Sequence, residues 1–130
     1  MKKFNFYFTF FLVSMLILGS CEKDYLAPVK KVEITGPVSF ATDIIPIITS
    51  NCANAATCHV QGGHSPNLNT SNAFDGLATF VDPSNPMDSR LYKQITWASS
   101  PVMPPTAPAK LTPEQIGYIL AWIEQGAQNN

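Results

Sequence analysis

The sequence predicts a small all-α domain in which three to five short helices are joined by long loops. Two observations favour this class. The C-terminal segment has the clearest helical pattern in the chain, and the segments before it are short apolar runs separated by breaks rich in glycine and proline. A length of 130 residues allows one such domain behind an exported N-terminus.

The first twenty residues are typical of a secretory signal peptide. Lys2 and Lys3 give a positive start, the run from Phe4 to Leu18 is apolar, and small residues follow it. A membrane-spanning helix is the alternative, but spanning needs about 20 apolar residues, and this run is shorter. Residues 1–20 are therefore expected to be a signal peptide, and the residues at its end indicate that it belongs to a lipoprotein.

The residues Leu18-Gly19-Ser20-Cys21 resemble a bacterial lipobox. The resemblance implies that the chain is cleaved before Cys21 and that acyl groups on Cys21 anchor it to a bacterial membrane, facing the periplasm or the cell surface. An ordinary signal peptide followed by an incidental cysteine is the alternative. Residues 21–38 are then expected to form a flexible tether, because they contain prolines and charges without periodicity.

Charge and cysteine content narrow the function classes. Without Lys2 and Lys3 the chain has six basic residues against nine acidic ones, a net charge of −3, and no basic patch suggests nucleic acid. Three cysteines are an odd number for an exported chain, and lipidation of Cys21 leaves Cys52 and Cys58 as a pair. In an oxidising compartment this pair becomes either a disulfide or a site of haem attachment.

The domain is expected to cover residues 39–130 and to open with a helix from Asp43 to Asn51. Ser39, Thr42 or Asp43 can cap its first turn, and Pro46 is tolerated there. A strand is the alternative, because isoleucine favours strands, but the segment does not alternate and contains a proline. The apolar face of the helix consists of Ile44, Ile45, Ile47 and Ile48.

The most informative motif is Cys52 and Cys58 with His59 directly after them. Two thiols can form thioethers to the vinyl groups of a haem, and the adjacent imidazole can then bind the iron. A Cys-x-x-Cys-His run is typical of c-type haem attachment, whereas five residues separate the cysteines here. A disulfide that closes a small loop is the alternative, and zinc would need more ligands than the sequence offers.

The middle of the chain is expected to hold two short helices between loops. A glycine-rich loop follows His59, and helices are expected over residues 71–80 and 87–95. Residues 97–109 contain four prolines and are expected to be irregular. The inward-facing residues of the two helices are expected to be Phe74, Leu77, Phe80, Leu91 and Ile95.

The last helix has the strongest signals. Thr112 and Gln115 form a capping box, and Pro113 stands at the favoured first position. Gly126 can end the helix in the left-handed conformation. The buried stripe has helical spacing and consists of Ile116, Ile119, Leu120 and Ile123.

A haem iron also needs a ligand on its second face, and Met103 is the natural candidate. It lies in Pro101-Val102-Met103-Pro104-Pro105, where prolines keep the chain extended and stiff just before the last helix. A methionine that fills a gap in the core is the alternative. Met87 is a weaker candidate because it is expected to start a helix, and His64 is expected to face solvent.

The order of these motifs resembles a small class I cytochrome c, and more narrowly the cytochrome-c-like domains of exported bacterial lipoproteins. The resemblance covers residues 39–128. The matching stretches, which include a widened Cys-x5-Cys-His motif, are Asp43-Ile44-Ile45-Pro46-Ile47, Cys52 to His59, Asp82-Pro83, Ser89-Arg90-Leu91-Tyr92, Met103-Pro104-Pro105 and Trp122-Ile123-Glu124-Gln125-Gly126-Ala127.

The resemblance implies one covalent haem c per chain. Cys52 and Cys58 would hold the vinyl groups, His59 would be the proximal ligand and Met103 the distal one, a pair that raises the reduction potential. It also implies that the first and last helices pack through Ile44, Ile48, Ile119 and Ile123. The candidates for hydrogen bonds to the haem propionates are Arg90, Tyr92 and Trp97, and for each of them packing at the surface or in the core is an equally good alternative.

The sequence therefore favours electron transfer by a membrane-anchored monohaem cytochrome lipoprotein that exchanges electrons with a redox partner protein. A haem-free lipoprotein module, held by a disulfide and with a binding or structural role, is the alternative. An enzyme is not favoured, because no Ser/His/Asp set, paired carboxylates or phosphate-binding loop stands out.

Overall fold

A computed structural model describes residues 32–69, 73–105 and 110–130 of the chain. Within these ranges the protein is helical and has no strand, as the all-α class predicts. The expected signal peptide and Cys21 lie outside the described residues. No helix in the described ranges is both long and apolar enough to cross a bilayer.

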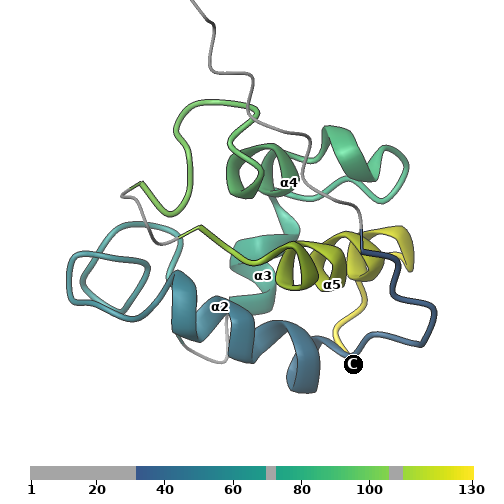
Figure 1. Ribbon diagram of the computed structural model, residues 1–130. Coiled ribbons are helices and arrows are strands. Elements are labelled where there is room, and N and C mark those ends of the chain that lie inside the picture. Colours follow the sequence, from purple (N-terminus) through teal and green to yellow (C-terminus); the bar gives the residue numbers. More distant parts are fainter. Residues whose placement is uncertain (1–31, 70–72, 106–109) are drawn as a thin grey trace, which may run out of the picture.

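Helix α5 runs through the middle of the molecule, with α4 on one side and α2 on the other (Figure 1). The expected haem-attachment loop, residues 52–69, lies at the left of this view, beside the end from which α5 starts. The elements in chain order are the π-helical turn η2 (Phe40–Ile44), α2 (Ile45–Asn51), α3 (Ala73–Ala78), the 3-10 turn η3 (Pro86–Asp88), α4 (Arg90–Ile95) and α5 (Pro113–Glu124).

The first helical segment begins at Phe40, earlier than the predicted Asp43. Ser39 and Asp43 cap it together: the backbone N–H of Ser39 donates to Asp43 Oδ2 at 2.8 Å, and Ser39 Oγ accepts from the backbone N–H of Thr42 at 3.4 Å. Pro46 lies in the first turn of α2, where its missing N–H removes no hydrogen bond of that helix. The segment therefore delivers Cys52 at its end, as predicted.

The core joins the first and last helical segments. Ile44, Ile48, Ile119 and Ile123 are all fully buried in one cluster, which agrees with the packing expected of them. Helix α5 has the predicted capping box between Thr112 and Gln115, and its whole apolar stripe is buried. Three aromatic rings extend this core: Phe40 lies 5.2 Å from Phe74 and 5.3 Å from Trp122, between ring centroids.

Residues 32–38 pack against α5, so the expected boundary at residue 39 is too late. The backbone N–H of Val38 donates to Gln125 Oε1 at 2.9 Å, and Gln125 Nε2 donates to the Gly36 carbonyl at 3.0 Å. A Cβ atom at Gly117 would lie only 2.7 Å from the carbonyl oxygen of Val32, so the absence of a side chain there allows this approach. The tether predicted for 21–38 therefore does not include these residues.

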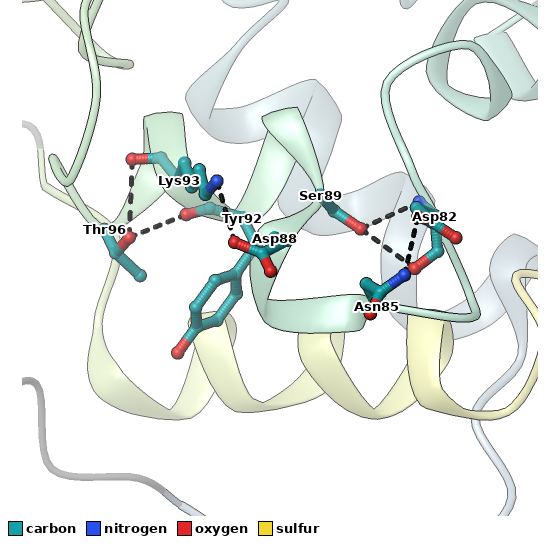
Figure 2. Close-up of polar contacts among 7 residues, drawn as sticks. All are labelled: Asp82, Asn85, Asp88, Ser89, Tyr92, Lys93 and Thr96. Atoms are coloured by element: carbon teal, nitrogen blue, oxygen red, sulfur yellow. Dashed lines mark hydrogen bonds and ion pairs between the residues drawn. The ribbon is translucent and has the colours of Figure 1, made fainter.

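The helix predicted over 87–95 is divided at Ser89, whose backbone is extended (φ −50°, ψ 134°). The buried Ser89 hydroxyl accepts a hydrogen bond of 2.8 Å from the backbone N–H of Asp82 and so joins α4 to the turn before η3 (Figure 2). The helix predicted over 71–80 is shorter in the structure, with α3 ending at Ala78; residues 71 and 72 lie outside the described ranges. Leu77, Leu91 and Ile95 are buried as predicted.

Candidate functional site

One loop brings Cys52, Cys58 and His59 together. Cys52 is the C-cap of α2, and the backbone N–H of His59 donates to its carbonyl at 2.9 Å. Because Cys58 directly precedes His59, this hydrogen bond brings Cys58 back close to Cys52 although five residues separate the two cysteines. Both thiols are free and half-buried, and the imidazole is half-buried beside them.

Burial, and after it the neighbouring Cys58, together raise the pKa of the Cys52 thiol from 9.0 to about 11. The two sulfur groups are thus close enough to influence each other electrostatically. The raised pKa disfavours the thiolate of Cys52, which is the strongly nucleophilic form of a cysteine.

The His59 ring is oriented by a backbone carbonyl. Its Nδ1 atom lies 3.1 Å from the carbonyl oxygen of Pro66. A carbonyl can only accept, so in the neutral ring this hydrogen bond places the proton on Nδ1 and leaves the lone pair of Nε2 free. An imidazole that ligates a metal is held in this way in most proteins. Sequence reasoning did not find Pro66, because a backbone acceptor leaves no side-chain signature.

The loop that delivers Pro66 is tightly folded. The backbone N–H of His64 donates to the Cys58 carbonyl at 2.9 Å, and that of Leu68 donates to the His59 carbonyl at 2.8 Å. A Cβ atom on Gly63 would overlap the carbonyl oxygen of Cys58, so only glycine fits there without movement. His64 is exposed, as predicted.

Met103 belongs to a second loop, residues 97–105, which has neither helix nor strand, as predicted. The carbonyl of Gln94 in α4 accepts from the backbone N–H of Trp97 at 3.2 Å and from that of Met103 at 3.0 Å. The two ends of the loop therefore meet at the end of α4. Met103 is half-buried, and its loop lies on the same side of the view as residues 52–69 (Figure 1).

Trp97 carries two signs of a binding role. Its Nε1 atom is buried and has no hydrogen-bond partner, which costs about 1–3 kcal/mol if it stays unpaired. Its φ of 61° is a strained left-handed conformation for a bulky residue, and such strain clusters at ligand sites. The ammonium group of Lys110 lies over the same ring, 4.1 Å from its centroid.

The other two candidates for haem propionates are placed differently. The Arg90 guanidinium lies over the ring of Phe80, 4.9 Å from its centroid. Tyr92 is half-buried and packs against the core. Trp97 is the better candidate of the three because its buried donor has no partner; the neighbouring Lys110 carried no sequence signal, because one lysine before a helix has no special pattern.

In the described parts of the chain, no three histidine, cysteine, aspartate or glutamate side chains gather as a metal-binding group. No protein-family model matches this chain, and no curated protein or solved structure matches it significantly.

Proposed function

We propose that this chain is a membrane-anchored monohaem c-type cytochrome lipoprotein that transfers electrons to or from a redox partner protein. In this proposal the helical domain has a small class I cytochrome-c-like fold, and Cys52 and Cys58 hold a covalent haem c. His59 and Met103 are its axial ligands.

The observation that carries the proposal is the hydrogen bond from His59 Nδ1 to the Pro66 carbonyl. This hydrogen bond fixes the tautomer of His59 that leaves Nε2 free. His59 directly follows Cys58, and the backbone hydrogen bond from His59 to Cys52 holds the other cysteine close by. A bystander histidine in a disulfide loop would need no such orientation. The same contact also positions the ring so that it cannot rotate freely.

Two further features of the described structure support the proposal. The bound haem would supply one-electron exchange between ferrous and ferric iron. Trp97 Nε1 and Lys110 offer an N–H donor and a positive charge for a carboxylate, which is the polar group that a haem propionate presents. The Met103 loop, closed at Gln94 and stiffened by prolines, limits how far its thioether can move.

The test is to produce the full chain in cells that have a c-type maturation system and to record its visible spectrum after denaturation and reduction. Covalent haem gives a coloured chain under these conditions, and Cys52→Ser or Cys58→Ser should weaken the attachment. A colourless chain with Cys52 and Cys58 joined as a disulfide would reject the cytochrome and favour the haem-free lipoprotein module.

The membrane anchor is a separate part of the proposal, and its residue lies outside the described structure. Cys21→Ser should release the protein from the membrane fraction, because the acyl groups have no other attachment point. Retention of the Cys21→Ser variant in that fraction would contradict lipidation and would leave the haem assignment untouched.

A further inference from the structure

Trp97 is held in a conformation that other contacts have to maintain. Its φ of 61° lies in the left-handed region, which a bulky residue rarely adopts, and its buried Nε1 atom has no partner within the described ranges. The strained backbone and the unpaired donor each raise the free energy of the folded chain. Contacts elsewhere in the structure must therefore keep the residue in place.

The backbone around Trp97 is fixed by the end of α4. The carbonyl of Gln94 accepts from the backbone N–H of Trp97 at 3.2 Å. The carbonyl of Lys93 accepts from the backbone N–H groups of Ala98 and Ser99 at 2.8 and 3.2 Å. These hydrogen bonds set the path of the chain, but they leave the side-chain torsion angles of Trp97 undetermined, because none of them involves the indole ring.

The ring itself is held by Lys110. The Lys110 ammonium lies over the indole, 4.1 Å from the ring centroid, and tryptophan is the aromatic side chain that attracts a cation most strongly. The position of Lys110 is fixed in turn by the start of α5, since the next residue, Leu111, is buried in the core and Thr112 caps the helix. The contact therefore joins the end of α4 to the start of α5.

The placement of Lys110 is not explained by α5. A positive charge close to the N-terminus of a helix is unfavourable, because the helix dipole is positive at that end. Lys110 lies two residues before the N-cap, Thr112. In the part of the chain that the structure describes, the recorded ion pair of a lysine is that of Lys93, and no carboxylate pairs with the Lys110 ammonium. The ring of Trp97 is thus the partner that accounts for its orientation.

We propose that Lys110 is a positioning residue, which holds the ring of Trp97 so that the Nε1 donor is already oriented when a haem carboxylate binds. The inference rests on the proposed function and goes beyond it, because Lys110 acts here through the indole ring in addition to the charge that it brings. A donor that is already oriented loses little conformational freedom when its acceptor arrives, so the hydrogen bond is stronger.

The chain contains its own reference for a test of this role. It has two tryptophans, and the second, Trp122, is buried and donates from Nε1 to the Gln128 carbonyl at 2.9 Å. Exchange of both indole N–H protons with solvent can be measured by NMR in the reduced, haem-loaded protein. The Trp97→Phe variant identifies the Trp97 signal, because that signal is then missing from the spectrum.

In Lys110→Met the Trp97 proton should exchange about two- to fivefold faster, the factor expected from losing an exposed cation–π contact, while the Trp122 proton keeps its rate. Lys110→Arg keeps a cation over the ring and should restore the wild-type rate. The matched control is Lys93→Met, because the Lys93 ammonium lies 2.8 Å from Asp88 and its loss leaves the contact between Lys110 and Trp97 intact.

The reduction potential distinguishes positioning from charge. Lys110→Met should lower the potential, because a haem carboxylate with a weaker hydrogen bond keeps more negative charge near the iron and favours the ferric state. The fall should be larger in the wild type than in Trp97→Phe, where a ring remains but the donor is gone. Equal falls in the two backgrounds would mean that Lys110 acts by its charge alone, and would overturn the proposal.

The proposal is also overturned if Lys110→Met leaves the exchange rate of the Trp97 proton unchanged, or if Lys93→Met raises it as much. Haem loading is checked in every variant from the denatured spectrum. A chain that never takes up haem would reject the proposed function and this inference with it, whereas a loaded chain with an unchanged exchange rate would reject only the positioning role of Lys110.

Discussion

His59 Nδ1 and the carbonyl oxygen of Pro66 lie 3.1 Å apart, and this contact decides which ring nitrogen is available for ligation. The contact joins the start of the loop that follows the cysteines to its far side. The contact between His59 and Pro66 depends on the conformation of the backbone between them. Within that segment Gly63 lies so close to the Cys58 carbonyl that no side chain fits there.

Replacing Gly63 with alanine should therefore disturb the loop. The new Cβ atom would force the backbone apart, at a cost of about 1–3 kcal/mol, and would move the Pro66 carbonyl away from His59. Urea unfolding of the haem-loaded protein measures the loss of stability. Gly36→Ala is the control, because nothing lies within 4 Å of its added Cβ and its backbone has no positive φ; equal losses in the two variants would argue against this account.

Met103→Ala should abolish the weak absorption band of iron–sulfur ligation and lower the reduction potential. The fall should be on the order of 0.1 V, within the roughly 0.8 V that axial ligands span. The matched control is Met87→Ala, which removes an exposed methionine from η3 and should leave both the band and the potential unchanged. A Met103→Ala protein with an unaltered spectrum would assign the second face of the iron to another group.

Trp97→Phe should keep most of the packing and remove the unpaired N–H. If that donor binds a haem carboxylate beside Lys110, its loss should destabilise the haem-loaded protein by about 1.5–3 kcal/mol, the range for a hydrogen bond to a charged group. Tyr92→Phe, which removes a polar atom from a half-buried ring on α4, provides the comparison in thermal unfolding. A Trp97→Phe protein as stable as the wild type would mean that Nε1 has no partner in the loaded state either.

Asp82 should make the stability depend on pH in acid. The Asn85 side chain donates to its carboxylate at 3.3 Å (Figure 2), and the backbone N–H of Ser84 donates to it at 2.9 Å. These hydrogen bonds hold the pKa of Asp82 below its ordinary 3.8. A lowered pKa means that the unfolded state binds the proton more readily, so this stabilisation is complete above pH 3.8 and is lost as pH falls through the folded-state pKa.

The measurement is the free energy of unfolding between about pH 6 and about pH 2, around the ordinary range of an aspartate. Asp82→Ala should flatten the acid side of the curve, and Asn85→Ala should flatten it in part, because Asn85 supplies the largest share of the shift. If both variants retained the full wild-type dependence, the acid sensitivity would have to come from other carboxylates.

Local signals in the sequence were sufficient where a few neighbouring residues determine the structure. The capping box of Thr112 and Gln115 and the stripe on α5 are such cases, because both depend on spacing within one helix. The position of Cys52 at the end of α2 is another, since the apolar face and Pro46 together restrict where that helix can run.

Contacts between distant residues could not be predicted in the same way. The break at Ser89 arises because its hydroxyl binds Asp82, and the ordered position of residues 32–38 arises because Gln125 binds Val38 and Gly36. The role of Pro66 is carried by a carbonyl that every residue possesses. The orphaned Nε1 of Trp97 likewise becomes visible only when the surrounding atoms are in place.

The backbone link between His59 and Cys52 has a consequence for how such chains evolve and how they are found. Because this link, at 2.9 Å, ties the ends of the segment together whatever lies between them, residues can be gained or lost at positions 54–57 without displacing either end. We therefore expect that the number of residues between the two cysteines can change without loss of the structure on either side. A sequence search that requires one fixed number of residues between the two cysteines would miss proteins with this arrangement.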